Sequence, residues 1–254
     1  MNIFRDHLRR ELRETQVQHE ASMGDMRSLV AHLIDPDTDA DDATKQTLLL
    51  SGLNRRRFMQ IGGVSVLSAA VLAACGKDDN TGATTNTTAA KGSASDIAIT
   101  RTASSLEYVA VDVYDQAIKS GLVTTAAIAD AAKLFQAQHR DHAALFEGAT
   151  KELGGDAFTT ANPAVMGSLA GRIAALKSET DVVTLARDLE NVAAATYQSA
   201  VGAFGDVRLN VQMMSVGGVE ARHATLLNGV LSANQFATNA FHTTTGAVTA
   251  GTGV

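Results

Sequence analysis

The spacing of apolar and polar residues divides the chain into segments of different character. Residues 1–53 are rich in charged side chains, a short apolar run follows, and residues 76–95 contain mainly small and polar residues. From about residue 96 to 235, apolar residues recur every three or four positions, which is typical of amphipathic helices. This pattern predicts four long helices that span about 95–120, 125–153, 180–204 and 206–232. It also predicts a shorter helix that starts at Asn162-Pro163 and runs through Leu176.

The lengths of the predicted links indicate how these helices are connected. The links near Gly121 and Gly205 are only a few residues long, whereas the link over 155–179 is long. Short, long, short is the connectivity of a four-helix bundle with one crossover. We therefore predict an all-α fold, with residues 96–235 forming the bundle.

Composition supports this class and excludes others. Aromatic residues make up 4% of the chain, and there are no tryptophans and only two prolines, which suits close-packed helices. A net charge of −6 argues against a nucleic-acid partner, which requires a basic face. A single cysteine excludes an intramolecular disulfide and a cysteine-based zinc cluster.

The bundle region contains an internal repeat. Leu106-Glu107 matches Leu189-Glu190, an offset of 83 because 190 − 107 = 83. His142-Ala143 matches His223-Ala224, an offset of 81 because 223 − 142 = 81. Each repeat is therefore a helix with one glutamate, a turn, and a helix with a histidine.

These repeated residues are candidate metal ligands. Glu220 and His223 lie three residues apart and project from one helix face, which is the Glu-x-x-His unit of metal sites in bundle cores. Glu107 and Glu190 lie within apolar stripes, where an unpartnered carboxylate is costly. The alternatives for these two are a buried ion pair or a position at the bundle rim.

The duplication and the ligand pattern resemble the ferritin-like di-iron carboxylate proteins, most closely the small bacterial ferritin-like domains exported by the twin-arginine route. The resemblance implies a ferritin-like bundle in which Glu107, Glu190, Glu220, His142 and His223 bind metal. It also reveals a departure, since His139 stands where the family has a glutamate that bridges both metals.

His139 is either a third imidazole ligand or a hydrogen-bond donor behind the ligands. Three carboxylates with two or three imidazoles suit iron or manganese, and zinc remains open. Because His139 replaces the bridging glutamate, three alternatives stay open: a di-iron centre, a pair of metal ions bound with unequal strength, or a mononuclear site. Tyr114 and Tyr197 follow Glu107 and Glu190 by seven residues, and we expect core packing, with a redox role or a hydrogen bond to a ligand as alternatives.

The first 53 residues form a leader. Ile3 to Leu33 predicts a weakly amphipathic helix with apolar residues at Ile3, Phe4, Leu8, Leu12 and Val17. We interpret the leader as a solvated cytoplasmic extension, with a later start at Met23 or Met26 as the alternative. The fold class thus includes a disordered leader ahead of the signal and tether.

Residues 54–75 are interpreted as an export signal. Arg55 and Arg56 begin a stretch that resembles the twin-arginine consensus, and the apolar run Ile61–Ala74 is too short to span a bilayer. The run ends in Leu-Ala-Ala-Cys, which resembles a lipobox, so Cys75 becomes the lipidated first residue. The alternative is an ordinary buried apolar helix.

The signal predicts a protein held on the extracytoplasmic face of the membrane by a lipid, with the twin-arginine machinery as a partner. Residues 76–95 act as a flexible linker and 236–254 as a flexible tail.

Two function classes stay open at this stage. One is a metal-dependent oxidoreductase or iron-handling protein that consumes peroxide or oxygen. The other is a non-catalytic bundle with a degenerate metal site, acting in binding or envelope structure. The sequence predicts no oligomeric state.

Overall fold

The computed structural model describes residues 2–34, 93–206, 208–232 and 244–254, and every regular element in these ranges is a helix. The helices are α1 (Asn2–Ile34), α4 (Ala94–Lys119), α5 (Ala126–Glu152), α6 (Pro163–Ala174), α7 (Glu179–Ala200) and α8 (Arg208–Leu231). The four predicted long helices and the short crossover helix are thereby confirmed, with ends shifted by one to four residues.

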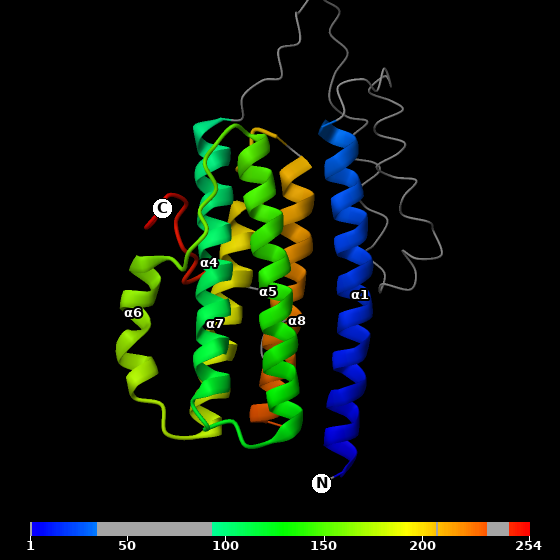
Figure 1. Cartoon of the computed structure of the whole chain (residues 1–254), viewed down its shortest axis with the longest axis vertical. Coiled ribbons are helices and arrows are strands. Elements are labelled where there is room, and N and C mark those ends of the chain that lie inside the picture. Colours follow the sequence, from blue (N-terminus) through cyan, green and yellow to red (C-terminus); the bar gives the residue numbers. More distant parts are fainter. Residues whose placement is uncertain (1, 35–92, 207, 233–243) are drawn as a thin grey trace, which may run out of the picture. The chain divides into compact units, whose positions relative to one another are not determined.

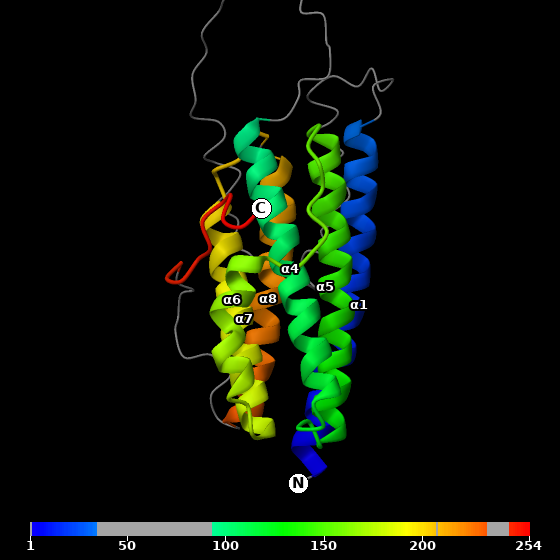
Figure 2. The ribbon, with the colours of Figure 1, turned by 60° about the vertical axis from the view of Figure 1, so that its left-hand side comes forward.

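The long helices α4, α5, α7 and α8 run side by side (Figures 1 and 2). The most extensive contacts are within the hairpins α4–α5 and α7–α8. The crossover helix α6 lies outside this group, where Leu169 joins an apolar cluster with Val109 and Val113 of α4 and Leu185 of α7. This is the predicted bundle with one long crossover.

Polar side chains at the helix ends tie neighbouring helices together. The Ser93 side chain caps α4 by accepting from the Asp96 amide. The buried Asp96 carboxylate in turn accepts from the amides of Gly205 and Asp206, which fixes the α7–α8 turn against the start of α4. Glu179, the first residue of α7, accepts from the amides of Thr124 and Thr125 at the start of α5. These bonds set the axial positions of the helices, on which the alignment of the site residues depends.

Gly217 allows α7 and α8 to approach closely. A Cβ atom at this position would lie 3.1 Å from the Cβ of Tyr197. Helix α8 is continuous through Gly217-Gly218. Gly217 therefore serves close helix packing and does not interrupt α8.

The leader begins with α1, which confirms the helix predicted over Ile3 to Leu33, and the rest of the leader, residues 35–53, lies outside the described residues. Residues 1–27 and 91–254 belong to one compact unit. Leu8 and Leu12 of α1 are buried in an apolar cluster with Ala131 and Phe135 of α5. Val17, placed in the apolar stripe from the sequence, is 66% exposed, because the buried face is Leu8, Leu12, Thr15, His19 and Met23.

The end of the predicted tail also contacts the bundle. The amide of Val248 donates to Thr196 of α7, and the amide of Gly251 donates to Thr102 of α4. The carbonyl of Thr252 accepts from the side chain of Asn162. Residues 244–254 are therefore held by specific hydrogen bonds.

The predicted export signal with Cys75 and the predicted linker, as far as residue 92, lie outside the described residues. Among the helices that the structure does describe, none combines the length and the apolar character needed to cross a bilayer.

Asn162 offers a test of how the crossover is anchored. Its buried side chain caps α6, donates to Ser105 and donates to Thr252. Asn162→Ala removes these bonds and leaves buried partners unpaired, so we expect a loss of about 2 to 4 kcal/mol in the free energy of unfolding. Ser168→Ala, at an exposed position on the same helix, should cost less than about 0.5 kcal/mol. Denaturant unfolding of both variants measures this, and equal midpoints would refute the anchoring role.

Candidate metal centre

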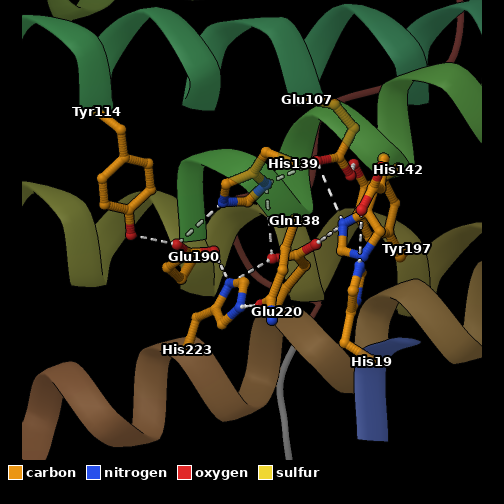
Figure 3. Close-up of polar contacts among 11 residues, drawn as sticks. His19, Glu107, Tyr114, Gln138, His139, His142, Glu190, Tyr197, Glu220 and His223 are labelled. Carbon is orange, nitrogen blue, oxygen red and sulfur yellow. Dashed lines mark hydrogen bonds and ion pairs between the residues drawn. The ribbon is translucent and has the colours of Figure 1, made fainter. Parts of the chain in front are cut away.

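Six carboxylate and imidazole side chains converge inside the bundle (Figure 3). Each is at most 2% exposed, although all six belong to the residue types that normally lie at the surface. They come from all four long helices: Glu107 from α4, His139 and His142 from α5, Glu190 from α7, and Glu220 and His223 from α8. The structure thus brings together every residue singled out as a ligand, while their role in binding stays a prediction.

The cluster contains two overlapping sets of potential ligands. One set is Glu107, His139, His142 and Glu220, and the other is His139, Glu190, Glu220 and His223. In each set, one donor atom per residue lies within 4.8 Å of the others. His139 and Glu220 belong to both sets, so the two positions for a cation are adjacent and share these side chains.

Several nitrogen and oxygen atoms that could bind a metal in these sets have no hydrogen-bond partner among the described residues. They are both ring nitrogens of His142, one oxygen of Glu190, both oxygens of Glu220, and Nδ1 of His223. Some of them face one another at ion-pair distances, such as 2.8 Å from His142 Nδ1 to Glu220 Oε1 and 3.1 Å from His223 Nδ1 to Glu220 Oε2. Buried polar atoms normally have partners. The residues present therefore fit a bound divalent cation, which would satisfy these atoms.

The site has an approximate two-fold arrangement that follows from the repeat. His139 is the repeat equivalent of Glu220, since 220 − 139 = 81. The hydroxyl of Tyr114 on α4 donates to Glu190 on α7, and the hydroxyl of Tyr197 on α7 donates to Glu107 on α4. Each repeat therefore supplies the tyrosine that orients the glutamate of the other. Of the roles considered for these tyrosines, the structure shows the hydrogen bond to the carboxylate.

His139 lies at the centre of the cluster. Its Nδ1 is 2.7 Å from Glu107 Oε2, and its Nε2 is 3.2 Å from Glu190 Oε1. The imidazole thus links the two repeat-related glutamates through opposite ring nitrogens. A carboxylate at this place would offer two oxygens and a negative charge, whereas the imidazole presents one nitrogen to each side.

The imidazoles and carboxylates shift one another's protonation. Burial lowers the pKa of His142, but the charges of Glu220 and Glu107 outweigh burial and raise the pKa to about 9. The pKa of His139 is likewise raised well above its usual range, because Glu220 and Glu190 outweigh its burial. Burial acts to raise the pKa of Glu107, yet His142 and His139 bring it down to about 2. Without a cation, the cluster is therefore stabilised by its own ion pairs.

Two residues that the sequence did not single out complete the surroundings. Gln138 of α5 is buried, and its Oε1 lies 2.6 Å from Nε2 of His223. His19 of α1 is 1% exposed and lies against His142, with ring centroids 5.0 Å apart. Burial and His142 lower the pKa of His19 to about 4. Gln138 has no counterpart in the second repeat, since position 219 is a valine, so the repeat offers no signal for it.

An apolar crevice between α4 and α7 reaches the other side of the cluster. Its walls include Val109, Leu189 and Val192, and at its base lie Glu107, His139 and Glu190. A cavity of about 410 Å³ opens nearby and shares Val113, Tyr114 and Ala186 with the crevice. The crevice itself holds about 30 Å³, room for about one water molecule beside these side chains.

Comparison with known families agrees with this architecture. The model of the ferritin-like domain matches residues 95–233, more than half of the chain. The chain belongs to the ferritin-like family. No curated protein and no solved structure matches it. The family assignment and the buried Glu/His cluster together are compatible with metal binding in this ferritin-like domain.

The pKa of His142 predicts how the stability of the metal-free protein depends on pH. A histidine whose folded pKa of about 9 exceeds the unfolded value of 6.5 contributes stability in full below pH 6.5. This contribution is lost as the pH rises from 6.5 through 9. We expect the guanidinium chloride midpoint of metal-free protein to fall over this range. His142→Gln should show a smaller fall, and equal slopes in the two proteins would contradict the assignment.

Proposed function

We propose that this protein is an exported, membrane-anchored ferritin-like protein that binds iron or manganese at the core of its bundle. The observation that carries the proposal is the pair of overlapping ligand sets, with buried donor atoms that lack hydrogen-bond partners. Mixed carboxylate and imidazole ligands favour Fe and Mn over Ca, because Ca prefers oxygen ligands alone. They also differ from the thiolate ligands that select softer metals. The alternative metal, zinc, is distinguished by metal analysis.

The residues of the site have separate tasks in this proposal. Glu107 and His142 would hold a cation on one side and Glu190 and His223 one on the other, while His139 and Glu220 belong to both sets. Tyr114 and Tyr197 keep Glu190 and Glu107 in their ligand orientations. Burial and the neighbouring glutamates raise the pKa of both tyrosines well above the usual value, so their hydroxyls stay protonated as donors.

Binding of a cation is coupled to proton release. The pKa values of His139, His142 and His223 are raised by the glutamates, which outweigh burial, and a histidine must be unprotonated to bind metal. The site is therefore expected to bind metal more weakly at low pH. Iron, when bound, would supply redox chemistry with peroxide or oxygen, limiting radical damage near the envelope.

A second candidate is a non-catalytic bundle that binds a partner or supports the envelope. The observation that favours it is the pair of contacts from His139 to Glu107 and Glu190, which closes the cluster without a metal. Metal content distinguishes the two candidates directly.

The first test measures metal content after purification without added metal and after anaerobic loading with Fe(II) or Mn(II). Two divalent ions repel strongly in a low-dielectric core, and His139 lacks the charge of a bridging carboxylate. We expect wild type to hold fewer than two tightly bound ions per chain. His139→Glu should raise the number toward two and speed Fe(II) oxidation.

Two further variants serve as controls for this test. Glu220→Gln removes a ligand that is common to both sets. Loss of a residue that merely orients a ligand lowers metal affinity by roughly 10- to 100-fold, and we expect a larger fall in metal affinity here. Glu147→Gln changes a carboxylate on the same bundle that accepts from Tyr108 outside the sets, and should leave metal content unchanged. If wild type binds two ions tightly and His139→Glu changes nothing, His139 is not the weak point of the site. If wild type binds none, the second candidate is favoured.

The export part of the proposal rests on the sequence around Arg55, Arg56 and Cys75. Replacing both arginines with lysine should leave precursor in the cytoplasm, as measured by fractionation and immunoblotting. Cys75→Ala should abolish incorporation of labelled fatty acid while export through the paired arginines continues. Lipid labelling that persists in Cys75→Ala would rule out the anchor at this residue.

A further inference from the structure

The leader helix α1 contacts the metal centre through one face. Five buried residues, which we term the docking stripe of α1, are Leu8, Leu12, Thr15, His19 and Met23. Their spacing of three or four residues places them on one side of the helix. The described side chains of α1 thus resemble a fifth bundle helix in which a histidine replaces one apolar residue.

Two polar contacts from α1 reach residues that touch or form the ligand sets. Gln16 accepts a hydrogen bond of 2.8 Å from Nε2 of Gln138, whose Oε1 lies 2.6 Å from His223 Nε2. His19 lies 3.4 Å from Asp141 and packs its ring on His142. The ring nitrogens of His142 and His223 that face the glutamates are Nδ1 in both cases. Helix α1 therefore lies directly behind His142, on the side away from the carboxylates, and reaches His223 only through Gln138 of α5.

We propose that α1 is a detachable cover of the metal centre, closing it in the full-length chain and leaving it when the chain is cut before Cys75. The proposal rests on the metal-binding function proposed above. In the sequence, α1 precedes the twin-arginine segment and Cys75, whereas the bundle follows them. A cut before Cys75 therefore separates the cover from the site that it covers.

Before the cut, α1 and the bundle belong to one chain, so that α1 stays near the bundle and the contact between them forms. After the cut, nothing holds α1 near the bundle, and the contact is lost. The covalent link makes the contact of α1 with the bundle intramolecular. Among the α1 residues whose burial is described, the docking stripe buries two leucines and a methionine as its apolar part. Once the chain is cut and the parts are diluted or separated by the membrane, this contact is expected to dissociate. His142 then becomes accessible from the α1 side, while His223 stays covered by Phe135 and Gln138 of α5.

The first experiment uses the full chain with Leu8→Asp and Leu12→Asp, which place charges in the apolar cluster with α5. The matched control is Val17→Asp, at a 66% exposed position of the same helix. In metal-free protein, acylation of His142 by diethyl pyrocarbonate, measured by mass spectrometry, should rise at least about tenfold in the double variant. The control should match wild type. Circular dichroism and thermal unfolding establish that each variant is folded.

The same proteins are then loaded with Fe(II) or Mn(II), and metal transfer to a chelator is followed. The double variant should release metal at least about tenfold faster with unchanged stoichiometry. Unchanged acylation would overturn the cover, and raised acylation with unchanged release would overturn its control of metal exchange. A fall in stoichiometry would show that α1 contributes to binding itself, which also contradicts the proposal. If wild type binds no metal while acylation rises in the double variant, the proposed metal binding is refuted, whereas the covering of the cluster by α1 is supported.

A second experiment tests detachment without any substitution in α1. A protease recognition sequence is inserted within residues 76–92, and the folded protein is cut and passed over a size-exclusion column. We expect the α1 fragment to separate from the bundle, and acylation of His142 to rise as in the double variant. A stoichiometric complex that survives the column at micromolar concentration would refute detachment.

Discussion

The burial of three carboxylates at one point of a helical bundle is the constraint on which the rest of the site depends. An uncompensated buried charge is costly, and Glu107, Glu190 and Glu220 lie together with almost no access to solvent. The surrounding imidazoles compensate them, and the mutual attraction raises the pKa of His142 to about 9 and lowers that of Glu107 to about 2. A cation would bind to the same donor atoms and would displace the protons that now balance the charge. The bundle core therefore suits two compensated forms, one paired internally and one that would hold metal.

The duplication of the helix hairpin explains most of this arrangement. Glu107 and Glu190 are equivalent, as are His142 and His223, and the tyrosines cross over so that each hairpin orients the carboxylate of the other. Among the six candidate ligands, the symmetry fails at one pair of positions, where one hairpin has His139 and the other Glu220. These are the two residues that both ligand sets share. The asymmetry is thus concentrated where two cations would have to be bridged, which makes this pair decisive for the number of ions bound.

The two sides of the cluster differ in character. Toward α6, an apolar crevice between α4 and α7 leads to Glu107, His139 and Glu190. Toward α1, polar side chains contact the cluster, since Gln16 is linked to His223 through Gln138 and His19 packs on His142. The fold therefore surrounds the site with apolar side chains on one side and with polar side chains on the other.

Helix positions, connectivity, the repeat and the six candidate ligands were all predictable from the sequence, and the structure brings those six side chains together. The physical reason is that helical periodicity and duplication are properties of the order of residues along the chain. What each side chain contacts depends instead on which residue of another helix lies opposite, and packing alone decides that. Gln138 supports His223, the tyrosines hold the glutamates of the opposite hairpin, and His139 links Glu107 to Glu190. The docking face of α1 likewise emerged only in three dimensions, because His19 and Thr15 are polar residues that hydropathy assigns to the surface but that the bundle buries.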